Sequence, residues 1–390
     1  MTRITIAAIA TVAGTGTALA GGLDRSGQNV EILFEEGNIV ELNLGYVKPE
    51  VSGTDRDLPL PSPPFAPGAV LPGGAETGDV ADNFFQGGLG YKQDLDDRFS
   101  FAFIIDQPYG ADVSYTDFAS GGSQLLGGTE ATLNSVAYTG LLRYKVTDRI
   151  SVHGGIRAQR IDPEVTLSGL AYGPVNGYNV LFEDDTSFGY QVGAAYEIPE
   201  IALRVSATYF SEIDHDLDTT ETLPNGVTLP ASRTEVTTPR AININAQTGI
   251  AEGTLAFASF RYADYDVTKV RPAFFDLATG GQSLTNIDTG RDFAIGVGRR
   301  FSDLFSGAVS LTYSDKGPDD LVSPLAPTDG RYGVLVSGVY NVTEQVRLTG
   351  GITYQRLGDA RAATGVPQVA RADFEDSDLI GIGLRVAYKF

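Results

Sequence analysis

Apolar residues alternate with small or polar residues over many short stretches of the chain. The last stretch is the most regular, because every second residue from Ile380 to Phe390 is apolar while the residues between them are small or basic. A period of two predicts β-strands with one apolar face. A soluble β-sandwich alternates in the same way, so alternation alone leaves the architecture open. Further stretches of this kind are 136–145, 150–156, 201–209, 305–313, 332–340 and 346–354.

The connections between these stretches fall into two classes that alternate strictly. Six short turns and seven long polar or Pro/Gly-rich loops predict fourteen strands, with both termini on the short-turn side. An even strand number with long loops at one end is typical of a bacterial outer-membrane barrel, and a sandwich has no reason for it. We therefore predict an all-β fold, a 14-stranded antiparallel transmembrane β-barrel over residues 39–390. The short turns lie near 94–97, 147–149, 198–200, 249–252, 302–303 and 342–345, and the long loops at 53–78, 107–129, 163–180, 213–235, 266–287, 315–329 and 358–372.

Aromatic residues lie beside the short turns on the apolar face, where a membrane barrel carries an interfacial girdle. The alternative is that they pack in the core of a soluble protein. A strand that ends the chain on Phe390 also resembles the C-terminal signal of outer-membrane barrels. The aromatic residues are Tyr91, Phe99, Tyr144, Tyr196, Phe301, Phe305, Tyr340 and Tyr388.

The N-terminus predicts export. Arg3 precedes an apolar stretch from Ile4 to Val12, and Ala18 to Ala20 form a small-residue cleavage pattern, so residues 1–20 are predicted to be a signal peptide. The rest of the chain contains no run of about 18 apolar residues, which excludes a membrane-spanning helix. Together with the strand pattern, this predicts the cell outer membrane. The chain has no Cys, so the fold does not rely on disulfides.

Charge and the scarcity of catalytic residue types exclude several functions. A net charge of −21 makes nucleic acid an improbable partner. Acidic loops are either simply solvated or bridged by divalent cations to outer-membrane lipid and lipopolysaccharide. No nucleophile motif accompanies His153 or His215, and we expect His215, between two aspartates, to lie in a solvated loop. Acidic stretches such as Asp315–Asp320 lack the spacing of a calcium loop. We expect no enzymatic activity, metal or cofactor.

Three short segments carry a resemblance to a known family. Gly22–Gln28, Tyr46–Gly53 and Asp106–Asp112 resemble the FadL-type outer-membrane transporters of long-chain fatty acids and other hydrophobic compounds. The Asn-Pro-Ala sequence often found at the N-terminus of members is absent, which indicates a divergent branch. The resemblance implies a monomeric passive channel with an N-terminal hatch. Ligands would be captured by external loops, bind in the lumen, displace the hatch and leave through the wall near the third strand.

Residues 21–38 are the expected hatch, or plug. They are too apolar for a free tail and too short for a domain, and Ile32, Leu33 and Phe34 would face the ligand path. The alternative is a periplasmic arm. In the third strand, Asp106, Pro108 and Gly110 mark the expected kink for lateral exit, because proline donates no ladder hydrogen bond and glycine weakens a strand. The alternative is that Pro108 only begins the loop.

Inward-facing cations are the candidate partners of a ligand carboxylate, because an unpaired buried charge is costly. His153 and Arg157, two residues apart on one face, are the first candidates, followed by Arg143 and Arg204. The alternative is that these cations pair with luminal acids. The sequence thus favours a channel for passive uptake of long-chain fatty acids or similar hydrophobic compounds. A general aqueous porin or structural barrel is the alternative, and an outer-membrane hydrolase is disfavoured.

Overall fold

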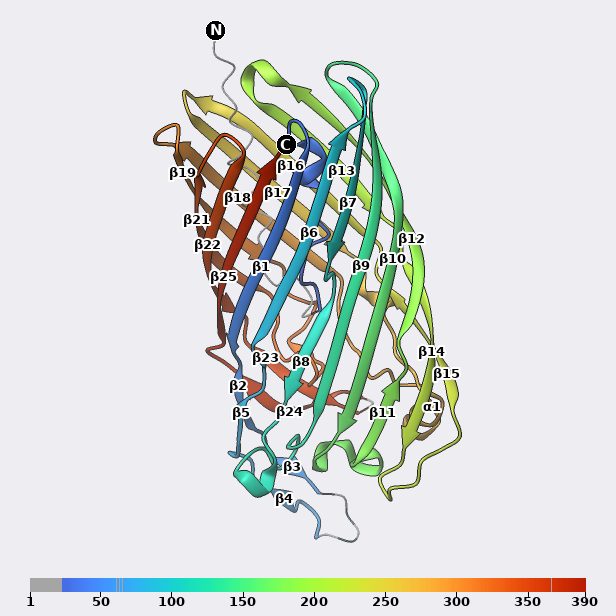
Figure 1. Ribbon diagram of the computed structural model, residues 1–390. Helices are drawn as coiled ribbons and strands as arrows, with labels where there is room; N and C mark the ends of the chain where they lie inside the picture. The colour runs from blue at the N-terminus through green and yellow to red at the C-terminus, as the bar shows by residue number, and fades with distance from the viewer. Residues whose placement is uncertain (1–22, 61, 63, 65, 366) are drawn as a thin grey trace.

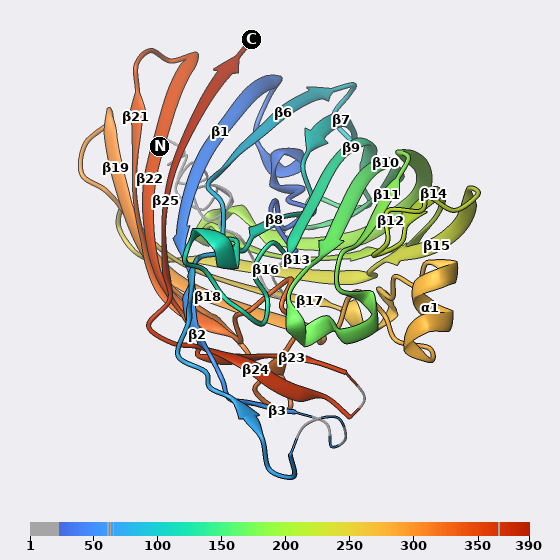
Figure 2. The same cartoon turned by 90° about the horizontal axis from the view of Figure 1, so that it is seen from below.

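The large sheet of the protein closes on itself. The computed structural model describes residues 23–390 apart from 61, 63, 65 and 366, so the predicted signal peptide lies outside the described residues. Strand β1 (Ile39–Glu50) pairs antiparallel with both β6 (Phe84–Asp94) and β25 (Asp378–Lys389), which joins the first wall strand to the last. Figures 1 and 2 show the resulting tilted barrel.

Four of the wall strands are interrupted and carry two labels each. They are β7 (Phe99–Asp106) with β8 (Gly110–Ser114), β11 (Tyr178–Phe182) with β12 (Asp185–Ile198), β13 (Leu203–Phe210) with β14 (Ile213–Thr222), and β15 (Ser232–Thr238) with β16 (Ala241–Ala251). The uninterrupted strands are β1, β6, β9 (Glu130–Lys145), β10 (Ile150–Leu167), β17 (Thr254–Ala263), β18 (Gly290–Arg300), β19 (Phe305–Ser314), β21 (Arg331–Asn341), β22 (Val346–Leu357) and β25. Within the described residues this gives fourteen antiparallel wall strands, and the predicted fold is confirmed.

The two faces of each wall strand follow the predicted alternation. In β25 the side chains of Ile380, Ile382 and Leu384 are exposed on the outside, whereas Arg385 and Ala387 are buried on the inside. An apolar outer face is stable only against lipid, so the same pattern that makes a strand also makes the membrane surface. No helix among the described residues is long and apolar enough to cross a membrane.

The long connections build a cap at one end of the barrel, opposite the C-terminus (Figure 1). Its five-stranded sheet has the order β20 (Leu321–Val322), β23 (Ala360–Thr364), β24 (Val369–Phe374), β2 (Ser52–Asp55) and β5 (Glu76–Asp79). A two-stranded arm contains β3 (Leu58–Pro59) and β4 (Val70–Leu71). The helices of the described chain are η2 (Glu31–Phe34), η3 (Phe118–Ser120), η4 (Leu170–Val175), η5 (Pro199–Ile201), η6 (Tyr265–Val267) and α1 (Ala273–Thr279).

Three predicted loops are wrong in extent. Residues 107–129 contain β8, which continues the wall strand begun by β7. Residues 163–180 begin with the end of β10, and residues 213–235 contain β14 and the start of β15. His215 is therefore not in a solvated loop but lies in β14, where its side chain is fully buried. The outward residues of β14 are aspartates rather than apolar side chains. The strand is barrel wall without an apolar outer face, so its hydropathy resembles that of a loop.

Candidate functional site

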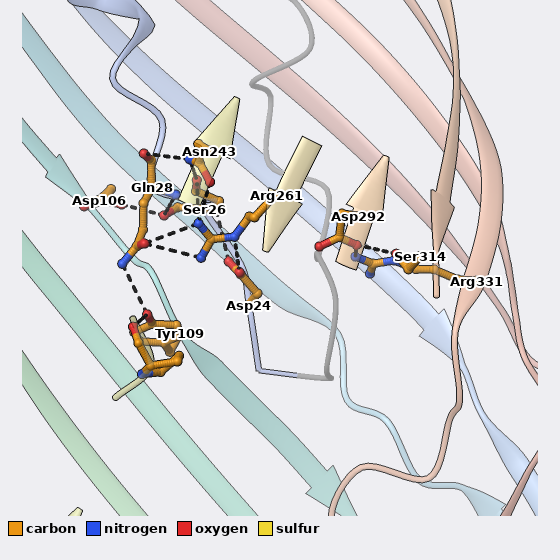
Figure 3. Close-up of polar contacts among 12 residues, drawn as sticks. Asp24, Ser26, Gln28, Asp106, Tyr109, Asn243, Arg261, Asp292, Ser314 and Arg331 are labelled. Atoms are coloured by element: carbon orange, nitrogen blue, oxygen red, sulfur yellow. Dashed lines mark hydrogen bonds and ion pairs between the residues drawn. The ribbon is translucent and has the colours of Figure 1, made fainter. Parts of the chain in front are cut away.

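The N-terminal segment from Leu23 to Asn38 lies inside the barrel and is held there by inward-facing side chains. Arg261 of β17 donates Nε–H to Asp24 Oδ2 at 2.5 Å, and Asn243 of β16 donates to the carbonyl of Gly27 at 2.8 Å. Gln28 accepts from Arg261 at 3.3 Å and donates to the Tyr109 hydroxyl at 3.2 Å. Figure 3 shows this network across the lumen. Buried polar groups are thus paired from both sides.

The second half of the segment presents an apolar turn to the lumen. Helix η2 buries Ile32, Leu33 and Phe34. Two guanidinium groups lie near the Phe34 ring, with the Cζ of Arg143 4.6 Å and that of Arg204 4.7 Å from its centroid. The centroid of the His153 ring lies 5.8 Å away in an edge-on contact. A cation over an aromatic face is favourable, and most so where water is excluded.

Carboxylates of the same segment neutralise luminal arginines. Glu31 pairs with Arg204, and Glu35 accepts from Arg347 Nη2 at 2.8 Å. Arg143 pairs with Glu197 of β12 and donates to the carbonyl of Leu33 at 3.2 Å. The luminal cations are therefore partnered by acids and carbonyls, as in the alternative interpretation of the sequence, and part of those partners belongs to the N-terminal segment.

The interruption between β7 and β8 is the place where the N-terminal segment joins the wall. Pro108 accepts a main-chain hydrogen bond from Arg25 at 2.9 Å, and Gly110 donates to the carbonyl of Leu23 at 2.8 Å. A Cβ on Gly110 would lie 2.2 Å from Arg25 Nε, so any larger residue here would have to displace the Arg25 guanidinium. Asp106 at the end of β7 accepts from Ser26 at 2.5 Å. The interruption thus faces the segment rather than starting a free loop.

A gap in the wall lies beside this interruption. Strand β6 pairs with β7 only as far as Leu89, opposite Ile105. Among the described residues β8 forms a ladder only with β9, and on its other side Val113 makes an isolated bridge with Ala81, outside β6. Gln107 partly bridges the gap, because its Oε1 accepts from the Gly87 amide at 2.9 Å. A cavity of about 90 Å³ lies here. Its lining includes Ser26, Ile32, Gln86, Gly87, Asp106 and Gln107.

An apolar pocket lies on the cap side of the N-terminal segment. Its volume is about 90 Å³, and its lining includes Leu23 of the N-terminal segment together with Tyr109 and Tyr265. None of the described residues that line it carries a charge. The side walls include Leu133, Ile161, Phe182, Val236 and Leu284. Such a pocket can bind an apolar group without leaving polar atoms unpaired.

Two wider cavities surround this pocket. One of about 180 Å³ shares Ala111, Ile287, Leu325 and Ala326 with it and also contains polar side chains. Arg25 lies here over the Phe84 ring at 4.0 Å and pairs with Asp112 at 2.5 Å. Another, of about 410 Å³, lies between η4, α1 and the β23–β24 hairpin of the cap and is lined in part by Tyr172, Phe275 and Arg371.

Acidic loops surround the cavity of about 180 Å³, and their carboxyl groups lie close together. Burial, together with Asp112 and Asp79, raises the pKa of the Asp82 carboxyl. Burial and the neighbouring Asp266, Asp319 and Asp329 raise the pKa of the Asp288 carboxyl in the same way. These groups are therefore protonated more readily than an exposed aspartate.

The structure brings most of the predicted site residues together. Arg143, Arg204, His153 and Phe34 form one cluster, and Arg157 donates to Asp106 at 3.2 Å. The His153 Nε2 contacts Thr208 at 2.9 Å. The sequence interpretation missed Arg261, Asp24 and Tyr109. Arg261 occupies an inward position of a regular strand, and that position is a signal that was available.

Comparison with known proteins was made at the level of family and of fold. Residues 7–271 match the model of the family described as outer membrane protein transport protein (OMPP1/FadL/TodX). No protein in a search of curated proteins matches the chain significantly.

Several solved structures share the fold. A FadL homologue of Pseudomonas aeruginosa superposes with a TM-score of 0.72 at 15% identity and covers 98% of both chains. The toluene transporter TodX of P. putida gives 0.62 at 14% identity, covering 92% of both chains. The toluene transporter TbuX of Ralstonia pickettii gives 0.63 at 12%, covering 98% of this chain and 97% of the other.

Proposed function

The chain belongs to the OMPP1/FadL/TodX family of outer-membrane transport proteins, and from this premise we propose that it is a passive channel for small hydrophobic compounds. The single observation that carries the proposal is the apolar pocket, lined by no charged side chain, next to a segment that lies in the lumen. A general aqueous porin needs an open path, and the contacts of residues 23–38 do not favour one. No energy source is required, since the compound moves down its own gradient.

The proposed route has four stages. A compound is captured in the cap, in the cavity of about 410 Å³ lined in part by Tyr172 and Phe275. It then enters the apolar pocket. Release of the N-terminal segment from Pro108 and Gly110 opens the inner end of that pocket. The compound leaves sideways through the gap between β6 and β8. The supporting observation is that the segment and the gap share residues, since Ser26 and Ile32 line the gap cavity.

The lining of the pocket favours an uncharged ligand. A carboxylate placed among these apolar side chains would lose its hydration with no partner, which is costly. The proposed ligand class is therefore hydrocarbon-like. TodX and TbuX, which share the fold, are described as toluene transporters.

A long-chain fatty acid is the second candidate, and one observation favours it. The apolar pocket shares four lining residues with the cavity of about 180 Å³, and that cavity is also lined by Arg25 and Arg331. An acyl chain in the pocket would place its carboxylate toward these cations, as a charge-assisted partner requires. Arg25 would then exchange Asp112 for the ligand. His153, Arg157, Arg143 and Arg204 remain proposed ligand contacts for a later stage, once the segment is displaced.

Binding and conductance together test the proposal. Labelled toluene and labelled palmitate are titrated onto the purified protein and onto a variant lacking residues 21–38, and single-channel conductance is recorded for both. We expect saturable binding and little conductance in the wild type, and an open pore in the deletion. Large steady conductance of the wild type with neither ligand bound would leave a porin. Preference for toluene over palmitate separates the two ligand classes.

A further inference from the structure

A second break in the barrel wall lies between β12 and β14, away from the gap at β6. On one side of it, β11 pairs with β14 as far as Phe182 opposite Thr219. On the other, β12 pairs with β13 from Gln191 opposite Phe210. Between these two ladders, residues 184–189 and 212–217, all of which are described, form no ladder with one another.

The break has a simple geometric cause. In the wall strand formed by β11 and β12, Phe182 points inward and the next inward side chain is Asp185. The spacing is three positions instead of two, because the strand is irregular at 183–184. The neighbouring wall strand, formed by β13 and β14, is irregular at 211–212. Its inward side chains on either side of this irregularity are Phe210 and Ile213. Between the two irregularities the strands alternate out of phase by one residue. A one-residue slip exchanges the two faces of a strand, so pairing there would turn buried side chains outward.

Main-chain bonds end at the edges of this break, where Glu183 donates to the Asp218 carbonyl at 2.8 Å and Ser211 donates to the Tyr190 carbonyl at 2.9 Å. Between these two bonds, side chains close the break. The Nδ1 of His215 contacts Asp185 Oδ2 at 2.9 Å across it, and Gln159 Nε2 lies 3.2 Å from His215 Nε2. The consistent tautomer donates from Nδ1 to Asp185 and accepts at Nε2 from Gln159. Ile213 packs over Gly189, where a Cβ would lie 2.6 Å from Ile213 Cγ1. Glycine is needed here because the side chain from the opposite strand occupies its space.

The break lies directly beside the apolar pocket. Phe182, the last residue before it, lines the pocket, and so does Thr238, whose hydroxyl accepts from Gln159 at 3.0 Å. The outer flanks are of mixed character. Phe188 and Tyr190 of β12 are 71% and 54% exposed on the outer face, while Asp214 and Asp216 of β14 are exposed on the opposite flank. An apolar-to-acidic boundary with aromatics is typical of a membrane interface.

We propose that this break is a second lateral portal, through which small uncharged hydrophobic compounds dissolved in the outer leaflet enter the apolar pocket directly. The inference rests on the proposed function, because it uses the same pocket. Separating the strands here breaks the His215–Asp185 contact and the packing of Ile213, but no ladder. Gln191 also lies buried at the inner end, and neither its Nε2 nor its Oε1 has a hydrogen-bond partner. Opening at that end therefore sacrifices no side-chain bond of Gln191.

Access from the bilayer can be measured with thiols, because the chain contains no Cys. Phe182→Cys places a thiol in the pocket beside the portal, and Thr353→Cys places one on the inner face of β22, whose ladders are continuous. Each variant is reconstituted in vesicles that contain N-dodecylmaleimide, which stays in the bilayer. The thiolate adds across the maleimide double bond, the adduct carbon takes up a proton, and the mass increase gives the rate.

The expected result is preferential reaction of the Phe182→Cys thiol, accelerated further by loss of the His215 contact. His215→Ala should raise its rate roughly tenfold, the scale of a lost hydrogen bond to a charged group, and leave the Thr353→Cys rate unchanged. Gln107→Ala, which loosens the gap beside β6, is the matched variant. Acceleration by Gln107→Ala but not by His215→Ala would overturn the portal, and so would equal rates at the two thiols.

Protection by ligand separates this proposal from the proposed function. Saturating toluene should slow the reaction of the Phe182→Cys thiol if the pocket binds hydrophobic compounds. Protection without any effect of His215→Ala would remove only the portal. Absence of protection, with binding also absent in the direct titration, would remove the pocket function itself. If Phe182→Cys does not fold, Val236→Cys provides a second reporter on the pocket wall.

Discussion

Arg261 Nε and Asp24 Oδ2 are 2.5 Å apart, and both side chains are almost completely buried. The two residues are separated by 237 positions, one on a regular wall strand and the other at the start of the segment inside the barrel. Removing one member of a buried ion pair leaves an unpaired buried charge, which costs on the order of 3–5 kcal/mol. The pair therefore anchors the segment far more strongly than an exposed pair would.

Arg261→Ala should release this anchor and raise the conductance of the channel. Among the residues that the structure describes, Asp24 has no second cation in direct hydrogen-bond contact, so the segment gains by moving toward water. Planar-bilayer recordings measure the open probability. Arg233→Ala removes an exposed pair with Asp216 and should leave the conductance unchanged, since exposed pairs contribute little. Equal conductance of wild type and Arg261→Ala would show that the pair does not hold the segment.

Phe34→Ala should destabilise the inner half of the segment by about 3–5 kcal/mol. The substitution leaves a cavity and removes the ring that contacts both the Arg143 and the Arg204 guanidinium groups. Hydrogen exchange of the amides from Glu31 to Glu35 measures the loss of protection. Phe301→Ala is the control, because that ring is 64% exposed on the outer face. Unchanged exchange in Phe34→Ala would mean that the glutamate pairs alone hold the turn.

Gly110→Ala should displace the segment from the interruption of the third wall strand. The added methyl overlaps the Arg25 guanidinium, and the main-chain bond from Gly110 to Leu23 must lengthen. Hydrogen exchange of the amides at positions 25 and 110, which donate to Pro108 and Leu23, should become faster. The double variant Arg25→Ala/Gly110→Ala restores the space but loses the Asp112 pair, so it should recover the main-chain contact. Equal exchange of these two amides in the single and double variants would contradict this steric explanation.

Asp288→Asn should stabilise the loops around the cavity of about 180 Å³ at neutral pH. Burial and three neighbouring aspartates raise the pKa of Asp288 in the folded protein. A raised carboxyl pKa favours the folded state below the ordinary value of 3.8, and this advantage is lost as pH rises through the raised pKa. The asparagine variant should therefore show a flatter pH dependence. Hydrogen exchange of residues 286–290, measured between pH 4 and pH 7, gives the local stability of both proteins. If this stability depends on pH equally in the wild type and in the variant, the predicted destabilisation by ionised Asp288 is wrong.

The sequence by itself determined the wall. A period of two is imposed by the pleat, and lipid outside with polar groups inside makes that period visible from Ile380 to Phe390. Strict alternation of short and long connections then sets an even strand number. The apolar turn at Ile32–Phe34 and the proline at 108 were visible for the same reason, since each departs from the local pattern. Where the outer face is acidic, as beside His215, that signal disappears and the strand is indistinguishable from a loop.

Only the tertiary structure decided what meets inside the barrel. Closure of the barrel brings inward positions that are distant in the sequence into one lumen. Ion pairs form there between Arg261 and Asp24, Arg347 and Glu35, and Arg157 and Asp106. Alternation shows that a side chain points inward but not which opposing side chain it reaches. The break between β12 and β14 has the same origin. It arises from the relative phase of two irregularities, at 183–184 and 211–212, and that phase exists only once the strands lie side by side.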